Sequence, residues 1–148
     1  MHLTADGRDA LHHRLERLRT EVVAPLGAMI GEPDHDRRID DDYDRAFAEA
    51  AHLEQLLAEA AEVRPPEDRT LVALGSLADL RFSDDSVERL RLVHPAEAFL
   101  DDERVSVESP VAKAVLGRRL GDTVDVEAPS GRLRAEIVAV WQPELVLA

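Results

Sequence analysis

The spacing of the apolar residues changes near the middle of this chain, and that change decides most of what the chain can fold into. Between residues 39 and 60 an apolar or small side chain recurs every three or four positions: Ile39, Tyr43, Ala46, Ala50, Leu53, Leu57 and Ala60. Such steps place the side chains in one narrow stripe along an α-helix, and their heptad repeat is typical of a coiled coil. Beyond residue 70 apolar and polar residues alternate, which is typical of β-strands. The sequence therefore predicts a helical first half and a sheet-forming second half.

A similar helical stripe precedes the first one. Its members are Leu11, Leu15, Leu18, Val22, Leu26 and Met29. Thr4 is placed to cap the start of this helix, Pro25 should kink it or remove one hydrogen bond, and Gly31 and Pro33 should end it. Because each stripe is narrow, we expect the two helices to cover one another as an antiparallel hairpin about 35–40 Å long.

A stiff polar segment, Arg64–Arg69 with two prolines, is the predicted domain boundary. The segments predicted as strands are residues 71–74, 77–82, 87–93, 104–107, 123–127 and 133–141. Ser109 and Pro110 should open one short helix, as a capping hydroxyl and a first-position proline, and Gly117 should close it. We therefore predict an α+β protein, with residues 1–64 as a coiled-coil finger and residues 70–148 as an antiparallel sheet domain with one short helix.

The charge balance limits the kinds of partner. With 18 basic and 31 acidic residues the net charge is −13, which opposes binding to duplex DNA, so we expect no sequence-specific DNA binding. The chain has no cysteine, which excludes disulfides and thiolate chemistry. No apolar run is long enough to span a membrane, and the first residues lack the apolar core of a signal peptide. We expect a cytoplasmic protein without a membrane partner.

Much of the negative charge lies in one stretch, residues 32–44, where the predicted hairpin turns. This stretch contains seven acidic and two basic residues, a net charge of −5. Its acids are Glu32, Asp34, Asp36, Asp40, Asp41, Asp42 and Asp44. They are either a solvated turn with ordinary helix-start acids or a site for a divalent metal or a basic partner. An EF-hand is excluded, because Ile39 and Arg45 stand where that loop needs Gly and Glu.

The second half resembles a known family in its motifs. The run Val105-Ser-Val-Glu-Ser-Pro-Val-Ala-Lys-Ala-Val-Leu-Gly117, followed by Gly121-Asp-Thr-Val124 and Pro129-Ser-Gly131, is similar to the strand, short helix and closing hairpin of the Gre factors. These are transcription elongation factors that promote transcript cleavage by bacterial RNA polymerase. The resemblance covers nearly the whole chain, since the opening helix and Pro25 also match.

The resemblance implies a partner and a set of site residues. The C-terminal domain would have an FKBP-like fold without isomerase activity and would dock at the rim of the polymerase secondary channel. The docking residues would come from the signature: Ser109, Pro110, Val111 and Lys113. The finger would enter the channel as a monomer, close to the 3′ end of the nascent RNA. It would bind no cofactor stably but would share the polymerase Mg²⁺ through Asp36, Asp40, Asp41 and Asp42, with Glu32 and Asp34 as further tip acids.

The tip departs from the pattern of the cleavage-promoting members. These carry an Asp, then Glu-Asn three and four residues later, shortly before a Tyr. Counting back from Tyr43, these positions fall on Asp36, Ile39 and Asp40, so the Glu is missing. The dense aspartates look more like the inhibitory members of the family. We therefore expect a modulator or inhibitor of elongation that is not itself an enzyme. The alternatives are a cleavage stimulator, a short-finger regulator of nucleotide metabolism and a stand-alone metal-dependent hydrolase.

Overall fold

The computed structural model describes residues 1–143 and divides into two compact units. One unit, Asp6–Ala60, is the helical hairpin, which we call the finger. The other contains Met1–Ala5 together with the chain from Ala61 onward, and we call it the sheet unit. The sequence predicts that all of residues 1–64 belong to the finger. The first five residues lie instead with the sheet unit, because they pair with the strand that follows the hairpin. No helix among the described residues is long and apolar enough to cross a membrane.

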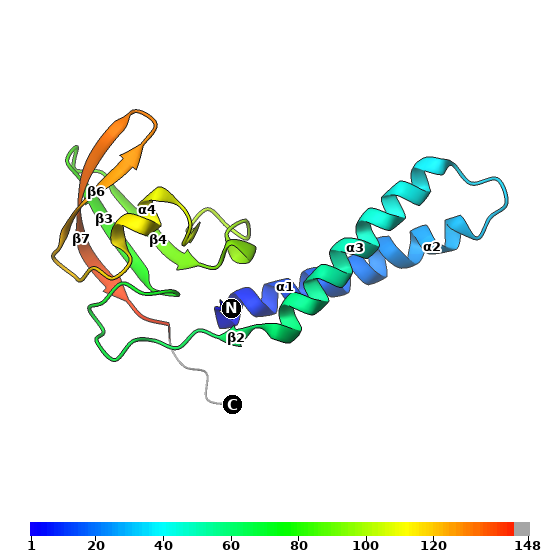
Figure 1. The fold of residues 1–148 in the computed structure, drawn as a ribbon, viewed down its shortest axis with the longest axis horizontal. Coiled ribbons are helices and arrows are strands. Elements are labelled where there is room, and N and C mark those ends of the chain that lie inside the picture. Colours follow the sequence, from blue (N-terminus) through cyan, green and yellow to red (C-terminus); the bar gives the residue numbers. More distant parts are fainter. Residues whose placement is uncertain (144–148) are drawn as a thin grey trace. The chain divides into compact units, whose positions relative to one another are not determined.

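The finger consists of two antiparallel arms (Figure 1). The first arm is a continuous run of α1 (Ala5–Arg17), the π-helical segment η1 (Leu18–Val23) and α2 (Ala24–Ile30). The second arm is the single helix α3 (Arg37–Glu59), 23 residues long. Gly31 ends the first arm, as its position in the sequence predicts.

Pro25 explains the π-helical segment. Proline has no N–H to donate to the preceding turn, and its ring crowds the carbonyl there. Just before Pro25 the helix winds more loosely, with more residues in each turn than an α-helix has. The N–H of Ala24 therefore donates to the carbonyl of Arg19, five residues earlier. The expected disturbance is therefore a wider turn inside a continuous arm.

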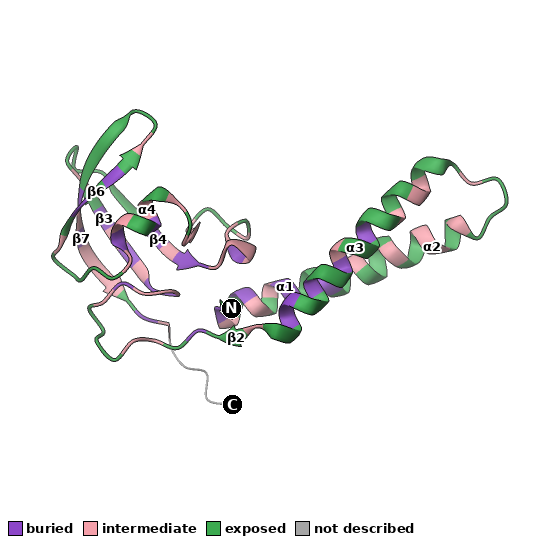
Figure 2. Cartoon of the chain, in the orientation of Figure 1, coloured by how far each residue is buried: buried purple, intermediate pink, exposed green. Residues whose placement is uncertain are grey.

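The apolar seam of the finger is tight at one end and loose at the other. Figure 2 shows that the buried part of α3 begins near the middle of the helix and continues away from the turn. The buried side chains are Leu11, Leu15, Ala46, Ala50, Leu53, Leu56 and Leu57. By contrast, Val22 is 37% exposed and Met29 is 50% exposed, although both belong to the predicted stripe. A π-helical turn holds more residues than an α-turn, so side chains within it, such as Val22, and beyond it, such as Met29, rotate away from a seam spaced for 3.5 residues.

The sheet unit is built on five strands and one short helix. These are β3 (Leu77–Phe82), β4 (Val87–Val93), β5 (Arg104–Ser106), α4 (Pro110–Val115), β6 (Thr123–Ala128) and β7 (Gly131–Trp141). The strand order is β5-β4-β3-β7-β6, and α4 packs beside β6. The core between helix and sheet includes Leu80, Leu92, Val115 and Ile137, all fully buried. The predicted α+β architecture of a helical hairpin and a sheet domain is confirmed.

Two details of the predicted sheet are wrong. The sheet is mixed rather than antiparallel, because β4 and β5 run parallel after a connection through the short 3-10 helix η2 (Pro95–Glu97). Residues 71–74 form only an isolated bridge between Leu71 and Arg119. Val72 is buried there, with its N–H and carbonyl paired to residues 117–118, and Gly75 then turns the chain at φ +88°. The apolar residues of this run are therefore explained by burial and not by a strand.

The chain start is fastened to the sheet unit by a buried carboxylate. Strand β1 (His2–Leu3) pairs in parallel with β2 (Ala61–Glu62). Thr4, directly before α1 as predicted, donates its N–H to Glu97 Oε2 at 2.8 Å and its hydroxyl to Glu97 Oε1. Arg104 Nε lies 3.7 Å from the same carboxylate, which is fully buried. Charge-assisted hydrogen bonds and an arginine together offset the cost of burying this charge.

The uneven seam predicts an uneven response to truncation. We expect Leu53→Ala or Leu15→Ala to lower the free energy of unfolding of the finger by about 2–4 kcal/mol, because each leaves a cavity in the tight part. Met29→Ala should cost less than about 1 kcal/mol, because half of that side chain is already in water. Chemical denaturation followed by helical circular dichroism measures both. Equal losses at Leu53 and Met29 would contradict the account of the seam.

Candidate functional site

The acidic stretch lies where the two arms of the finger meet. The turn comprises residues 31–36, between the end of α2 and the start of α3. Asp36 occupies the cap position of α3: its carboxylate accepts the N–H of Arg38 at 2.9 Å, and the Arg38 guanidinium lies 3.3 Å from it. Asp40, Asp41 and Asp42 follow in the first turns of α3, where negative charge interacts favourably with the helix dipole.

His35 joins the turn to α3. Its Nδ1 lies 2.9 Å from the carbonyl oxygen of Glu32, and its Nε2 lies 2.8 Å from Asp40 Oδ1. Both partners are acceptors, whereas a neutral imidazole has only one N–H to donate. The imidazolium, with two N–H groups, satisfies both contacts. These bonds therefore raise the pKa of His35, first through the Glu32 carbonyl and then through the Asp40 carboxylate, with Asp36 adding a smaller attraction.

The predicted metal ligands do not converge on one point. Asp40, Asp41 and Asp42 are consecutive in a helix, so their side chains leave the axis about 100° apart. Asp40 is engaged by His35 and Asp36 by the backbone of α3. Asp42 lies 3.9 Å from Arg45 in an exposed contact. Within residues 1–143 no group of three or more His, Asp or Glu side chains is arranged to hold a metal ion.

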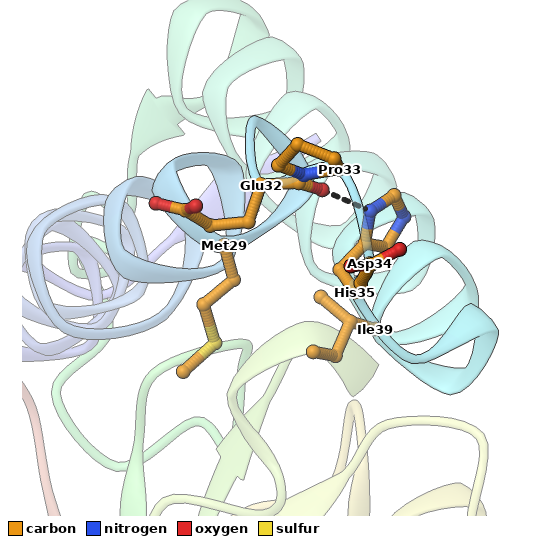
Figure 3. A pocket seen from close by; sticks show the side chains of 6 residues that line it. All are labelled: Met29, Glu32, Pro33, Asp34, His35 and Ile39. Carbon is orange, nitrogen blue, oxygen red and sulfur yellow. Dashed lines mark hydrogen bonds between the residues drawn. The ribbon is translucent and has the colours of Figure 1, made fainter.

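A hollow of about 320 Å³ opens beside the turn. It is lined by Met29, Glu32, Pro33, Asp34, His35 and Ile39. Figure 3 shows Met29 from α2 and Ile39 from α3 projecting from the two arms, with the residues of the turn between the arms. Glu32 and Asp34, predicted as further tip acids, line this partly apolar hollow together with Ile39.

The predicted docking residues lie at the start of α4 of the sheet unit, with Ser109 directly before the helix. The Ser109 hydroxyl accepts the N–H of Ala112 at 3.3 Å and caps the helix, with Pro110 at its first position. Ala112 is buried in the core and Val111 packs partly against it. Pro110 and Lys113 are exposed and three residues apart, so they share the outer face of the helix. Of the four, these two are available to a partner.

Two features of the finger become visible only in the structure. Two arginines of the first arm pair with glutamates of the second, Arg14 with Glu49 (Nε to Oε1, 3.0 Å) and Arg19 with Glu54 (2.8 Å). His35 was missed by sequence reasoning. The sequence shows only a histidine five residues before an aspartate at the start of a helix. That spacing does not predict a contact unless the conformation of the turn is known.

Comparison with known proteins shows the family. The family model "Transcription elongation factor, GreA/GreB, C-term" matches residues 67–142. The transcription elongation factor GreA of Thermotoga sp. (strain RQ2) is 31% identical over 93% of this chain and 95% of its own. That of Geobacillus kaustophilus (strain HTA426) is 33% identical over 93% and 94%. The crystal structure of GreA factor homolog 1 (Gfh1) of Thermus thermophilus is 28% identical over 95% and 97%, with a TM-score of 0.44.

The chain belongs to the GreA/GreB family of transcription elongation factors. Members of this family act through RNA polymerase and not as stand-alone enzymes. The resemblance seen in the sequence is thereby confirmed. The tip residues themselves, and what they bind, stay a prediction.

The bridging histidine predicts a pH dependence. The folded state holds the pKa of His35 above its ordinary value of 6.5, so protonated His35 stabilises the turn. This stabilisation is complete below the unfolded value and disappears as the pH rises through the folded one. We expect the stability difference between the natural chain and His35→Ala to be larger near about pH 5.5 than near about pH 8.5. Unfolding at both pH values measures it, and Asp40→Asn should lower the pKa of His35 in an NMR titration.

Proposed function

We propose that this chain modulates or inhibits elongation by bacterial RNA polymerase. In this proposal the sheet unit docks at the rim of the secondary channel, and the finger brings its acidic turn through the channel to the catalytic Mg²⁺. The family membership supports the partner. The dimensions of the finger support the reach, since the 23 residues of α3 extend about 35 Å.

Two residues of the tip, Asp36 and Ile39, support inhibition rather than transcript cleavage. Ile39 stands where cleavage-promoting members have a Glu, and its apolar side chain cannot move a proton or hold a metal. Asp36, at the aspartate position, is hydrogen-bonded as the cap of α3. A tip built this way lacks the acid–base group that hydrolysis requires, while it keeps the negative charge that a catalytic metal attracts.

The fit of Mg²⁺ to the tip is partial. Mg²⁺ favours six oxygen ligands in near-octahedral geometry, usually from one or two carboxylates and several other donors. Asp41 and Asp42 are exposed and can each offer a carboxylate, while Asp40 would first have to leave His35. The finger is therefore suited to add ligands to an ion that the polymerase already holds. When bound, the ion supplies Lewis-acid chemistry, and the finger residues supply charge and position.

If the sheet unit docks through α4, replacing the exposed residues of this helix should weaken binding to polymerase. We expect Pro110→Ala/Lys113→Ala to weaken binding to core polymerase about tenfold, because two exposed contact residues are removed without disturbing the core. Arg132→Ala, which removes an exposed arginine from β7, is the matched control and should bind normally. Equilibrium binding to labelled polymerase measures both. Unchanged affinity of the double variant would remove α4 from the proposed interface.

The tip part predicts a separation of binding from effect. Replacing Asp40, Asp41 and Asp42 with Asn keeps the shape and removes three charges. Polymerase binding should persist, while half-inhibition of nucleotide addition should need at least about ten times more protein, equivalent to about 1.4 kcal/mol. Extra Mg²⁺ should weaken the natural chain in the same way. Neutralising Glu67, Asp102 and Glu127 is the charge-matched control and should have no effect.

The same assay discriminates the cleavage alternative. If the chain stimulates cleavage, Asp36→Asn alone should cause the largest loss, and the natural chain should shorten the transcript in a stalled, backtracked complex. Full inhibition by the triple Asn variant would show that the finger acts by obstruction, and the metal part of the proposal would fall.

A further inference from the structure

The chain passes between the sheet unit and the finger twice, between Ala5 and Asp6 and again between Ala60 and Ala61. In the proposed function, docking belongs to the sheet unit and the effect on the polymerase belongs to the tip of the finger. The contacts that hold the chain at these two crossings therefore decide how far the finger can move once the sheet unit has docked.

A buried carboxylate holds the first crossing. Glu97 is the only acidic side chain that is buried within residues 1–143, and it accepts both the N–H of Thr4, at 2.8 Å, and the Thr4 hydroxyl. Thr4 is itself 2% exposed and stands directly before α1. Arg104 Nε lies 3.7 Å from the same carboxylate. Both oxygens of Glu97 are thus bonded to one residue at the entrance to the finger, and we call this contact the anchor.

Strength alone does not account for a charge at this place. A buried ionic contact can often be replaced by apolar side chains of similar volume without loss of stability. Hydrogen bonds differ from apolar contacts because they are directional, and two bonds from neighbouring donors of one residue hold that residue in one orientation. The carboxylate of Glu97 therefore fixes the orientation of Thr4, from which the first arm starts.

Glu97 stands on a hydrogen-bonded support that continues into the proposed docking helix. Its N–H donates to the carbonyl of His94 at 2.9 Å, and Pro95 begins the 3-10 helix η2. Strand β5, which carries Arg104, pairs with β4 and is followed by α4. The segment from Glu97 to α4 therefore joins the anchor to the surface that is proposed to bind the polymerase.

The second crossing has a separate support. Ala61 and Val63 donate their N–H groups to the carbonyls of Met1 and Leu3, at 3.0 and 2.9 Å. A Cβ at Gly75 would lie 2.7 Å from Val63 Cγ1, so the glycine leaves room for this valine. Loss of the anchor should therefore loosen the first crossing while the second stays in place.

We propose that Glu97 is a positioning residue: by holding Thr4, it limits the movement of the finger relative to the sheet unit, so that docking of one unit places the tip of the other. The part that concerns docking rests on the proposed function. The part that concerns movement is a property of the chain alone and can be tested without polymerase.

Two substitutions of Thr4 separate the hydrogen bond from the packing. Thr4→Val keeps the branched shape and removes the hydroxyl, whereas Thr4→Ser keeps the hydroxyl and removes a methyl group. Losing a hydrogen bond to a charged group shifts the balance between held and released states by about tenfold or more. Thr70→Val is the matched control, because Thr70 also donates its N–H (2.9 Å) and its hydroxyl (2.6 Å) to one carboxylate, that of Asp68.

Spin labels measure the movement of the finger in the full chain. The sequence has no cysteine, so Ala48→Cys on α3 and Ser130→Cys between β6 and β7 give one labelled pair at exposed positions. We expect Thr4→Val to broaden the distribution of distances between the labels, while Thr4→Ser and Thr70→Val leave it unchanged. Glu97→Gln, which replaces one acceptor with a donor, should broaden it as well. An unchanged distribution in a folded Thr4→Val or Glu97→Gln chain, or equal broadening by Thr4→Ser, would overturn the proposal.

Polymerase then tests the consequence for the tip. Thr4→Val should bind core polymerase with an affinity within about twofold of that of the natural chain, because no docking residue is changed. Its maximal effect on nucleotide addition, measured with all polymerase bound, should fall to about half or less, while Thr4→Ser keeps the full effect. A lower affinity with an unchanged maximal effect would contradict the role of Glu97. If the natural chain binds without any effect on nucleotide addition, the proposed function fails, and the spin-label distances still decide the role of Glu97.

Discussion

The finger depends on one narrow apolar seam, and the seam is tight only in the half remote from the turn. Leu11 and Leu15 on the first arm and Leu53 and Leu57 on the second are buried, whereas Val22 and Met29 are partly in water. The loose region begins in the π-helical segment Leu18–Val23, which directly precedes the helix that contains Pro25. The tight half holds the arms together, and the residues near the turn contribute little to the packing of the hairpin. The acids and the exposed methionine both lie there.

Repulsion among the acids would loosen such a lightly packed end, and the structure compensates for it locally. Asp36 is used as a helix cap, Asp40 is bonded to His35, and Asp42 lies near Arg45. These contacts order the turn, yet they leave Glu32, Asp34 and Asp41 available. In the proposed function, the exposed carboxylates at the start of α3 are the ones that would meet the metal.

The sequence predicted the elements whose signal is periodic and missed those whose signal is tertiary. The α3 stripe, strands β3 and β4, and the Ser109-Pro110 helix start were all predictable, because each follows from spacing or capping chemistry. The buried Glu97, 93 residues from its partner Thr4, was not, because no local pattern marks a long-range pair. The apolar run 71–74 was misread for the same reason, since burial by tertiary contacts imitates a strand. At the site, the acids were visible in the sequence, but their divergence around the helix and their contact with His35 required the fold.

We propose above that the turn of the finger reaches the catalytic metal of RNA polymerase. Exchanging that metal for Fe²⁺ in a complex of polymerase with the full chain generates hydroxyl radicals at the active centre, and these cut nearby backbone. The account predicts cuts in this chain confined to residues 32–44, lost when excess Mg²⁺ displaces the iron. Cuts only in the sheet unit, or none in a complex shown to be intact, would contradict it.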